Sequence, residues 1–396
     1  MKKILLKFNK IISSILLVVL FIATYFLFFA NNKTAEASWW NPSWQYRRII
    51  KLTNTNDSDL VDFQTMLEIN TQEIISNSKM NSDCSDLRFA LGDGTAIDYV
   101  IEENNPGCNA TNTKIWIKVP RIYKGAEKTD IYMYHGNSSA SDAQDGTAVF
   151  EFYDNFDTFS TTTWENTGDI STTTGELTVE TGVVRSKATV AAMPGLVVES
   201  KLKWIDFTSG MYSGINVSEN IPVSNTDKLI FFTTHSSLNN RGVYLYGADD
   251  TGSSYNIAST NFQFSAATST NYILGYSLSE SQLKTYKNRE NLENFSGTWS
   301  SDFYLYFGYF EGNSTADVKD MTIDWVQIRK FAETMPTHTT ANIEEERPGG
   351  PVGYWDFNEG YGTTAHDNSG MGNDGAITGA TWKDESECVS GGVFVV

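Results

Sequence analysis

Apolar and polar residues alternate in many short segments of the chain, as they do in half-buried β-strands. One such segment runs from Trp44 to Leu52, and another runs from Phe63 to Ile69. Gly, Asn and Asp interrupt the segments at short intervals, and amphipathic helical periodicity is nearly absent. This spacing is typical of antiparallel β-sandwiches. The sequence therefore predicts an all-β protein of tandem antiparallel β-sandwiches, a small sandwich followed by a jelly roll.

A long apolar stretch precedes the first strand. Four lysines form a basic flank, and residues 11–30 then carry no charge. Ala35-Glu36-Ala37 has the small-x-small pattern that a signal peptidase cuts, yet the apolar run is also long enough to span a bilayer. Residues 1–37 are therefore expected to form a hydrophobic helix, either a cleaved signal peptide or a retained membrane anchor. Both interpretations place the rest of the chain outside the cell or at its surface.

The grouping of strands and turns divides the exported part into four segments. Residues 38–150 and 151–331 each contain enough strands for one sandwich. Residues 332–350 are rich in Thr and then in Glu, Pro and Gly, which predicts a linker without a core. Residues 351–396 are too few to bury a core of their own.

Four segments of the first unit resemble, in order and spacing, the bacterial and archaeal surface domain known as domain of unknown function 2341. The four segments are Trp44–Arg48, Asp86–Phe89, Lys114–Pro120 and Ile131–Asn137. The resemblance covers about one hundred residues and implies a location at the cell surface. It implies no activity, because the family has none that is agreed.

The later units resemble domains of the concanavalin A-like lectin and glucanase superfamily. In residues 151–331 the resemblance lies in the opening strand, Phe152–Asp157, and the closing strand, Asp324–Lys330. Val352–Gly360 and the residues after it are similar to the opening of a laminin G-like domain. Such a domain needs well over one hundred residues, so 351–396 are expected to be an incomplete, C-terminally truncated copy that is poorly ordered or docks on the second unit.

Carboxylates at the two ends of the second unit are candidate metal ligands. Asp324 shares a strand face with apolar neighbours, so it is expected on the buried side, where a carboxylate needs a partner. Related jelly rolls hold calcium where the first and last strands meet. The resemblance therefore implies a structural Ca²⁺ bound by Asp154, Asp157 and Asp324, completed by backbone carbonyls and water. The alternative is that Asp324 bonds backbone amides or a nearby basic side chain.

Two pairs of tyrosines are the candidate ligand-binding residues. Tyr244 and Tyr246 alternate with apolar residues on one segment, and Tyr304 and Tyr306 do so on another. Such a face can stack on sugar rings, while the phenols bond sugar hydroxyls. The alternative is ordinary sandwich packing or a solvated face, because tyrosine is common in strands.

Candidate catalytic residues are sparse. Glycosidases need two carboxylates, and the related glucanases usually carry Glu-x-Asp-x-x-Glu, which is absent from this sequence. Glu176 and Glu180 share a strand face but have a different spacing. The four histidines fall in separate parts of the sequence, which disfavours a zinc site. From these patterns we expect no enzymatic activity.

Charge and cysteines narrow the possible partners. The net charge is −19, and because residues 1–37 hold five Lys and one Glu, the remainder carries −23. Nucleic acid is therefore an unfavourable partner. In an exported chain Cys84 and Cys108 are expected to form a disulfide, which leaves Cys388 without a mate.

The sequence favours non-catalytic binding of a polysaccharide or another cell-surface glycan, or adhesion through such binding. One alternative is a structural component of the cell envelope that binds proteins through its sheet edges. Another is a glycan-degrading enzyme with atypical carboxylates. Contact with a membrane is expected only through the N-terminal segment, if that segment is not cleaved.

Overall fold

The structure is a computed structural model, and most of the chain after residue 38 can be described. The described residues are 39–103, 106–173, 175–189, 195–205, 213–218, 229–235, 242–248, 254–256, 264–279, 281–296, 302–309, 321–347, 354–357, 359–367 and 373–382. The expected N-terminal helix and Cys388 lie outside them. Among these residues no helix has the length and apolar character needed to cross a bilayer. Two compact units form, the larger from Trp44–Phe89 with Ala96–Glu346 and the smaller from the other described residues.

The first sandwich belongs to the larger unit and has a five-stranded and a three-stranded sheet. Its elements are β1 (Tyr46–Asn54), β2 (Leu60–Ile69), α2 (Thr71–Ser76), β3 (Arg88–Leu91), β4 (Ala96–Ile97), β5 (Tyr99–Ile101), β6 (Thr113–Ile122), β7 (Gly125–His135) and β24 (Thr337–Glu346). The sheets run β24-β1-β7-β3-β4 and β2-β6-β5. The apolar positions of the alternating strands, such as Leu52 and Leu67, are fully buried.

The predicted disulfide of the first sandwich is confirmed. Cys84 and Cys108 are bonded, with their Cα atoms 6.0 Å apart. A cross-link that closes a loop of this length stabilises a domain by about 3 kcal/mol, mainly by restricting the unfolded chain.

The second part of the larger unit is a jelly roll of two antiparallel sheets. Its elements are α3 (Gly146–Val149), β8 (Phe152–Asp154), β9 (Trp164–Asn166), β10 (Ile170–Thr173), β11 (Glu176–Val179), β12 (Val183–Ser186), β13 (Leu196–Trp204), β14 (Ser213–Ser218), β15 (Leu229–His235), β16 (Gly242–Ala248), β17 (Ser254–Asn256), β18 (Phe264–Ser265), β19 (Tyr272–Leu278), β20 (Gln282–Lys287), β21 (Glu290–Ser296), β22 (Tyr304–Tyr309) and β23 (Met321–Lys330).

One sheet, here called the β23 sheet, runs β10-β11-β23-β13-β19-β20-β21, with β8 also paired to β23. The other, the β22 sheet, runs β17-β16-β15-β14-β22-β12-β9, with β18 on β16. Buried side chains of both sheets meet between them, among them Trp164, Trp204, Tyr276 and Phe307. The predicted all-β class, with tandem antiparallel sandwiches, is confirmed.

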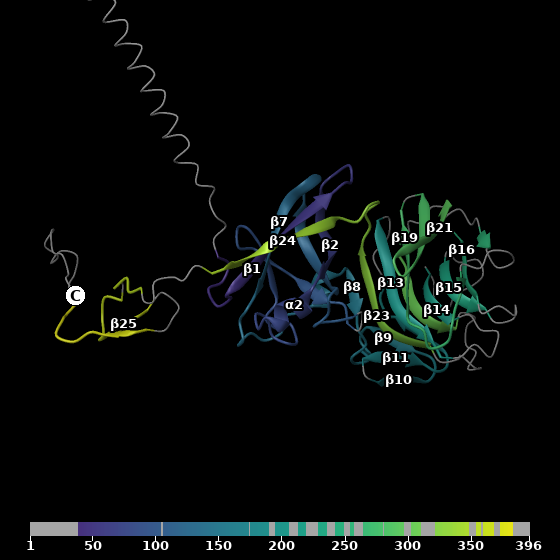
Figure 1. The fold of residues 1–396 in the computed structure, drawn as a ribbon. Helices are drawn as coiled ribbons and strands as arrows, with labels where there is room; N and C mark the ends of the chain where they lie inside the picture. The colour runs from purple at the N-terminus through teal and green to yellow at the C-terminus, as the bar shows by residue number, and fades with distance from the viewer. Residues whose placement is uncertain are drawn as a thin grey trace, which may run out of the picture. The chain divides into compact units, whose positions relative to one another are not determined.

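Strand β24 follows the jelly roll in sequence but belongs to the first sandwich. It pairs antiparallel with β1, from Thr53↔Thr337 to Tyr46↔Glu346, and Figure 1 shows the two strands side by side. The sequence predicts a linker over 332–350, because this stretch lacks apolar alternation, whereas the structure has a strand there. Strand β1 stabilises this strand through ion pairs. Arg47 Nε lies 2.7 Å from Glu345 Oε2, and Arg48 contacts Glu344.

The described part of the C-terminal segment is small. It contains one two-stranded sheet, β25 (Thr364–Ala365) with β26 (Gly375–Ala376). The carboxylate of Asp367 accepts hydrogen bonds from the backbone amides of Tyr354 and Asn373, each at 2.8 Å, and so connects the segments that flank the two strands. Its relation to a laminin G-like domain stays a prediction.

Candidate functional site

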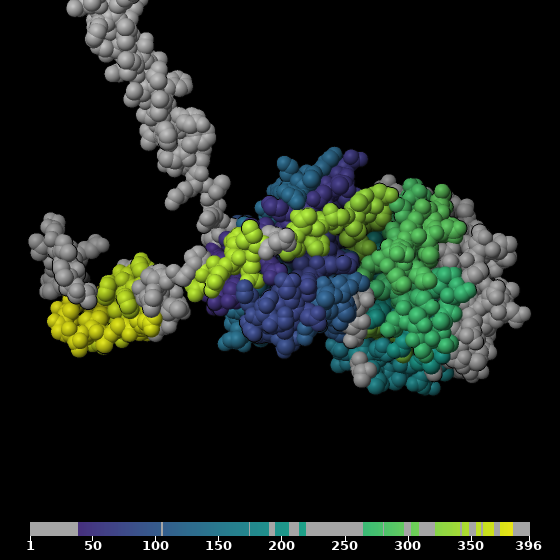
Figure 2. Space-filling model, in the orientation of Figure 1, coloured from purple at the N-terminus to yellow at the C-terminus, as the bar shows by residue number. Residues whose placement is uncertain are grey.

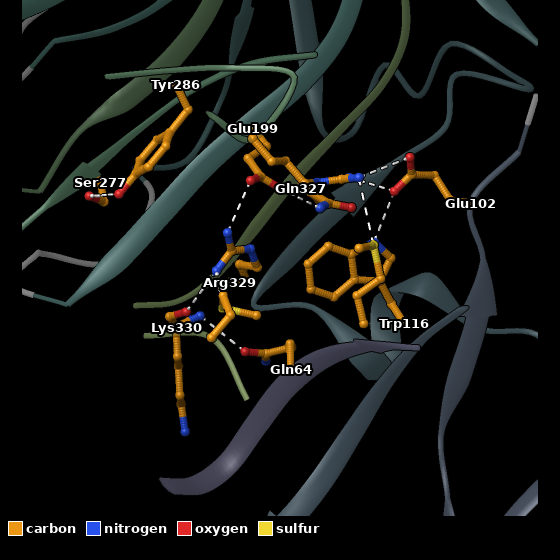
Figure 3. Close-up of polar contacts among 12 residues, drawn as sticks. Gln64, Glu102, Trp116, Glu199, Ser277, Tyr286, Gln327, Arg329 and Lys330 are labelled. Carbon is orange, nitrogen blue, oxygen red and sulfur yellow. Dashed lines mark hydrogen bonds and ion pairs between the residues drawn. The ribbon is translucent and has the colours of Figure 1, made fainter. Parts of the chain in front are cut away.

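The outer face of the β23 sheet carries charged side chains that lie against the first sandwich. Glu199 on β13 is 1% exposed and accepts hydrogen bonds from two residues of β23. Gln327 Nε2 donates to Glu199 Oε2 at 2.8 Å, and Arg329 Nη2 donates to Glu199 Oε1 at 3.0 Å. Figure 3 shows these residues converging between the sheet and the first sandwich.

Arg289, in the turn between β20 and β21, connects this cluster to the first sandwich. Its guanidinium lies 2.5 Å from Glu102 Oε2 and 3.6 Å from Glu199 Oε2, and it stacks 5.2 Å from the ring centre of Trp116. Trp116 Nε1 also donates to Glu102. Burial alone raises the pKa of Glu199, but the charges of Arg329 and Arg289 outweigh it and lower the pKa to about 2.

A backbone contact extends the same junction. The amide of Lys330 donates to Gln64 Oε1 at 3.0 Å, and Gln64 Nε2 donates to the carbonyl of Val149. The first sandwich, purple to blue in Figure 2, therefore lies against the outer face of the β23 sheet.

The register of the β22 sheet brings the four predicted tyrosines onto this one sheet. Tyr246 pairs with Phe231, Phe231 with Asn216, and Asn216 with Tyr306, so these positions form one row across four strands. Tyr304 and Ser218 pair in the next row on one side. Tyr244 occupies the next row on the other side, through Thr233, Gly214 and Gly308. Residues between the rows, such as Ile215 and Phe307, point into the core.

The described side chains of these rows are more enclosed than an open platform would be. Tyr306 is 3% exposed, Asn216 is fully buried and Tyr304 is half-buried. Asn216 Nδ2 donates to the carbonyl of Gly214 at 3.3 Å, whereas its Oδ1 has no hydrogen-bond partner in the described part of the chain. At the far end of the row, Arg185 Nε lies 2.5 Å from Glu165 Oε1, so the two charges cancel.

The sequence singled out the tyrosines but missed Asn216. Its strand, Ser213–Ser218, is short and carries only two apolar residues, Ile215 and Val217. Their alternation with Gly214, Asn216 and Ser218 is the signal that identifies the polar face.

The three predicted calcium ligands have other partners in the structure. Asp154 accepts the amide of Phe156 and the indole N–H of Trp164, the latter at 2.7 Å. Asp157 accepts from Asn155 Nδ2, and Asp324 Oδ2 lies 2.5 Å from Lys201 Nζ. Within the described ranges, no group of three His, Cys, Asp or Glu side chains is placed to hold a metal ion. Calcium at this place stays a prediction.

The alternative pair of catalytic acids is likewise engaged. Lys203 Nζ lies 2.8 Å from Glu176 Oε2, and Ser171 Oγ donates to Glu180 Oε1 at 3.2 Å. Glu176 belongs to β11, a strand of the β23 sheet, so the structure does not bring this pair together with the tyrosine rows.

The comparison with protein families matches one segment of the chain. Residues 83–167 match the family described as domain of unknown function (DUF2341), in agreement with the resemblance of the first unit. The match extends beyond residue 150, through β8 and β9, which the structure places in the jelly roll. No curated protein sequence matches the chain.

Solved structures are similar to about half of the chain or less. One comes from work on endo-acting O-glycanases with which human gut bacteria initiate mucin breakdown, and it is 13% identical. The match covers 46% of this chain and 100% of that chain, with a TM-score of 0.37. An endo-β-galactosidase from Clostridium perfringens is 14% identical. The match covers 46% of this chain and 62% of that chain, with a TM-score of 0.34. The laminarinase catalytic domain from Thermotoga maritima is 12% identical. The match covers 46% of this chain and 98% of that chain, with a TM-score of 0.35.

These neighbours correct one expectation from the sequence. We expected no enzymatic activity because the usual glucanase carboxylates are missing. The neighbours named above are glycan-cleaving enzymes, which contradicts that exclusion, and we withdraw it. The jelly-roll fold itself rests on the two sheets of this chain and their register.

Proposed function

We propose that this protein binds a polysaccharide or cell-surface glycan at the outer face of the β22 sheet. The observation that carries the proposal is the buried Asn216 Oδ1, which has no hydrogen-bond partner among the described residues and lies in the same row as Tyr306. A buried acceptor that lacks a donor costs about 1–3 kcal/mol, and a sugar hydroxyl would supply the donor. Tyrosines in the same and the adjacent row suit the apolar faces of sugar rings.

The charge of this face favours an uncharged glycan. In the three register rows the charged residues are Arg185 and Glu165, which pair with each other. The chain as a whole carries −19, so an acidic polysaccharide would be repelled. Neutral glycans avoid this penalty.

Hydrolysis of the glycan is a second candidate function, favoured by a separate group of carboxylates. Partial burial and the neighbouring charges of Asp157 and Asp324 raise the pKa of Glu103. Burial also raises the pKa of Asp324, although Lys201 opposes the shift. Glycosidases use two carboxyl groups, of which the acid has a raised pKa, so Glu103 and Asp324 are the candidates for hydrolysis in this group.

A panel of neutral and acidic polysaccharides, tested with the chain from residue 38 to 396, separates these functions. Binding is measured by titration calorimetry, and hydrolysis by release of reducing ends. We expect Asn216→Leu to weaken binding about tenfold, the equivalent of one lost hydrogen bond, and Tyr304→Phe to weaken it less. Tyr123→Phe, at an exposed tyrosine of the first sandwich, is the matched control.

Two outcomes would count against these functions. Equal binding by wild type and Asn216→Leu would remove the β22 sheet as the ligand face. Reducing ends that are still released by Glu103→Gln and Asp324→Asn would assign hydrolysis to other carboxylates, with Glu176→Gln and Glu180→Gln as the next variants.

A further inference from the structure

The pair of strands β1 and β24 is loaded at one end when the chain is stretched. Tyr46, which begins β1, is the partner of Glu346, which ends β24. At the other end of the pair, Thr53 lies opposite Thr337. Tension that reaches β1 from the residues before it, and β24 from the residues after it, therefore acts on two neighbouring positions. Hydrogen bonds between antiparallel strands lie perpendicular to the strands, so this tension breaks them one after another, as a zipper opens.

The edge position of β24 makes it the strand that detaches. Its sheet has β1 on one side of β24 and, among the described residues, no strand on the other side. Strand β1 is paired on both sides, with β24 and with β7. Detaching β24 therefore breaks one strand pairing, whereas detaching β1 breaks two. The buried Trp44, whose indole donates to the carbonyl of Asp86 at 2.6 Å, also holds the start of β1 in place.

Ion pairs are concentrated at the end of the pair that is loaded first. Arg47 Nε lies 2.7 Å from Glu345 Oε2. Glu344 lies 3.2 Å from Arg48 Nη2 and in direct contact with the ammonium of Lys79. These five side chains are here called the clasp. Hydrogen bonds between charged groups are roughly twice as strong as neutral ones, so tension meets the clasp before it meets the weaker part of the pair.

Beyond the clasp, the next attachment of the chain lies before β24. Residues 337–343 contain no Asp, Glu, Lys or Arg. Asn56 Nδ2 donates to the carbonyl of Thr334 at 2.7 Å, and the amide of Thr334 donates to Asn56 Oδ1 at 3.1 Å. Tension that has removed β24 therefore next acts on these bonds and on the bond from the amide of Lys330 to Gln64 Oε1.

We propose that the β1–β24 pair is a tension-opened clasp, which releases β24 at a lower force than the force that unfolds the jelly roll. While the clasp is closed, tension passes directly from β1 to β24. The jelly roll is inserted between β7 and β24, outside this path, so it carries no load. The inference concerns the first sandwich and does not depend on glycan binding.

The release of β24 has a characteristic length. Peeling frees the ten residues of β24, which extend to about 35 Å. The molecule also turns, so that the nine residues of β1, about 30 Å long, lie along the direction of pulling. The pulled ends therefore separate by up to about 60 Å. Unfolding of residues 151–331 would instead release roughly 600 Å.

Optical tweezers applied to the chain from residue 38 to 396 test this proposal. Handles attached at Ser43 and Arg347 load the pair as a zipper, because both residues flank the end that holds the clasp. Handles at Asp57 and Arg347 load it in shear, because Asp57 follows the opposite end of β1, and all bonds of the pair then share the force. We expect the zipper geometry to open at the lower force, in a first step of up to about 60 Å.

The variant Glu344→Gln tests the clasp itself. It keeps the size of the side chain but removes the charge that Arg48 and Lys79 contact. At the force that opens half of the wild-type molecules, we expect the variant to shift the equilibrium toward the open state about tenfold. Lys51→Met is the matched control, because Lys51 Nζ lies 3.0 Å from Asp130 and so joins β1 to β7. It should leave the opening force in the zipper geometry unchanged.

Three results would overturn the proposal. Equal opening forces of the wild type in the zipper and shear geometries would do so, even if a variant fails to fold. A first event that unfolds the jelly roll, with handles at Ser43 and Arg347, would place the jelly roll in the path of the tension. A folded Glu344→Gln protein that opens at the wild-type force would show that the clasp does not resist opening.

Discussion

Tyr46, the first residue of β1, is the backbone partner of Glu346, the last residue of β24, although the whole jelly roll lies between them in the sequence. The first sandwich is therefore built from two separate parts of the chain. The jelly roll is inserted between β7 and β24, and the chain enters and leaves the first sandwich at the same end of the β1–β24 pair.

Removal of β24 should destabilise the first sandwich. A chain that ends at residue 336 loses the pairing along β1 and the ion pairs of Glu344 and Glu345. Several hydrogen bonds of about 0.5–1.5 kcal/mol each are involved, so we expect a loss of about 3 kcal/mol or more in the free energy of unfolding. Denaturant unfolding measures it, with a chain that ends at Arg347 as the control. Equal stability of the two chains would contradict the role of β24.

The architecture was predictable where alternation is local, and β24 shows where it was not. Trp44–Leu52 reads as a strand because its apolar residues Trp44, Ile50 and Leu52 fall on the core side. Thr337–Glu346 has no such alternation, and its structure depends on Arg47 and Arg48, which are remote in sequence. The sequence shows the glutamates of this segment, but it does not show that two arginines of β1 lie opposite them.

The candidate site was predictable to a similar extent. Alternation placed Tyr304 and Tyr306 on one face, and the register confirms that they share it. Strand alternation does not reveal how deeply these side chains are buried, nor that Oδ1 of Asn216 has no hydrogen-bond partner among the described residues. The ion pair of Asp324 with Lys201 was unpredictable for the same reason. The pattern of one strand does not reveal which basic side chain lies on the neighbouring strand.

Arg289 should be a main determinant of the junction between the sandwiches. Arg289→Met leaves Glu102 and Glu199 buried without one of their cations. Breaking a buried ion pair in this way typically costs about 3–5 kcal/mol. Lys284→Met is the control, since Lys284 pairs with the exposed Glu333 and such pairs contribute at most about 1 kcal/mol. Thermal unfolding that responds equally to both variants would contradict this assignment.

Glu199 should also make the protein sensitive to strong acid. Its pKa is about 2 in the folded protein against an ordinary value of 4.5, so the folded state binds fewer protons. The stabilisation, about 3 kcal/mol, is complete above pH 4.5 and is lost as the pH falls through about 2. Denaturant unfolding between these pH values should show the loss in the wild type. Glu199→Gln should show a shallower dependence, and an identical slope would argue against the assignment.

Calcium at Asp154, Asp157 and Asp324 has a direct test. A bound ion would have to replace the ammonium of Lys201 at Asp324. If it binds there, added calcium should raise the melting temperature, EDTA should reverse the rise, and Lys201→Met should strengthen the effect. A melting temperature that responds to neither addition, in wild type and variant alike, would refute the calcium site.

The most direct test of the central claim is titration calorimetry of a neutral oligosaccharide, chosen from the polysaccharide panel, against wild type, Asn216→Leu and Tyr123→Phe. If the outer face of the β22 sheet binds glycan, Asn216→Leu should weaken the affinity about tenfold, and Tyr123→Phe should leave it unchanged. Equal affinity of all three proteins, or no binding by the wild type, would contradict the claim.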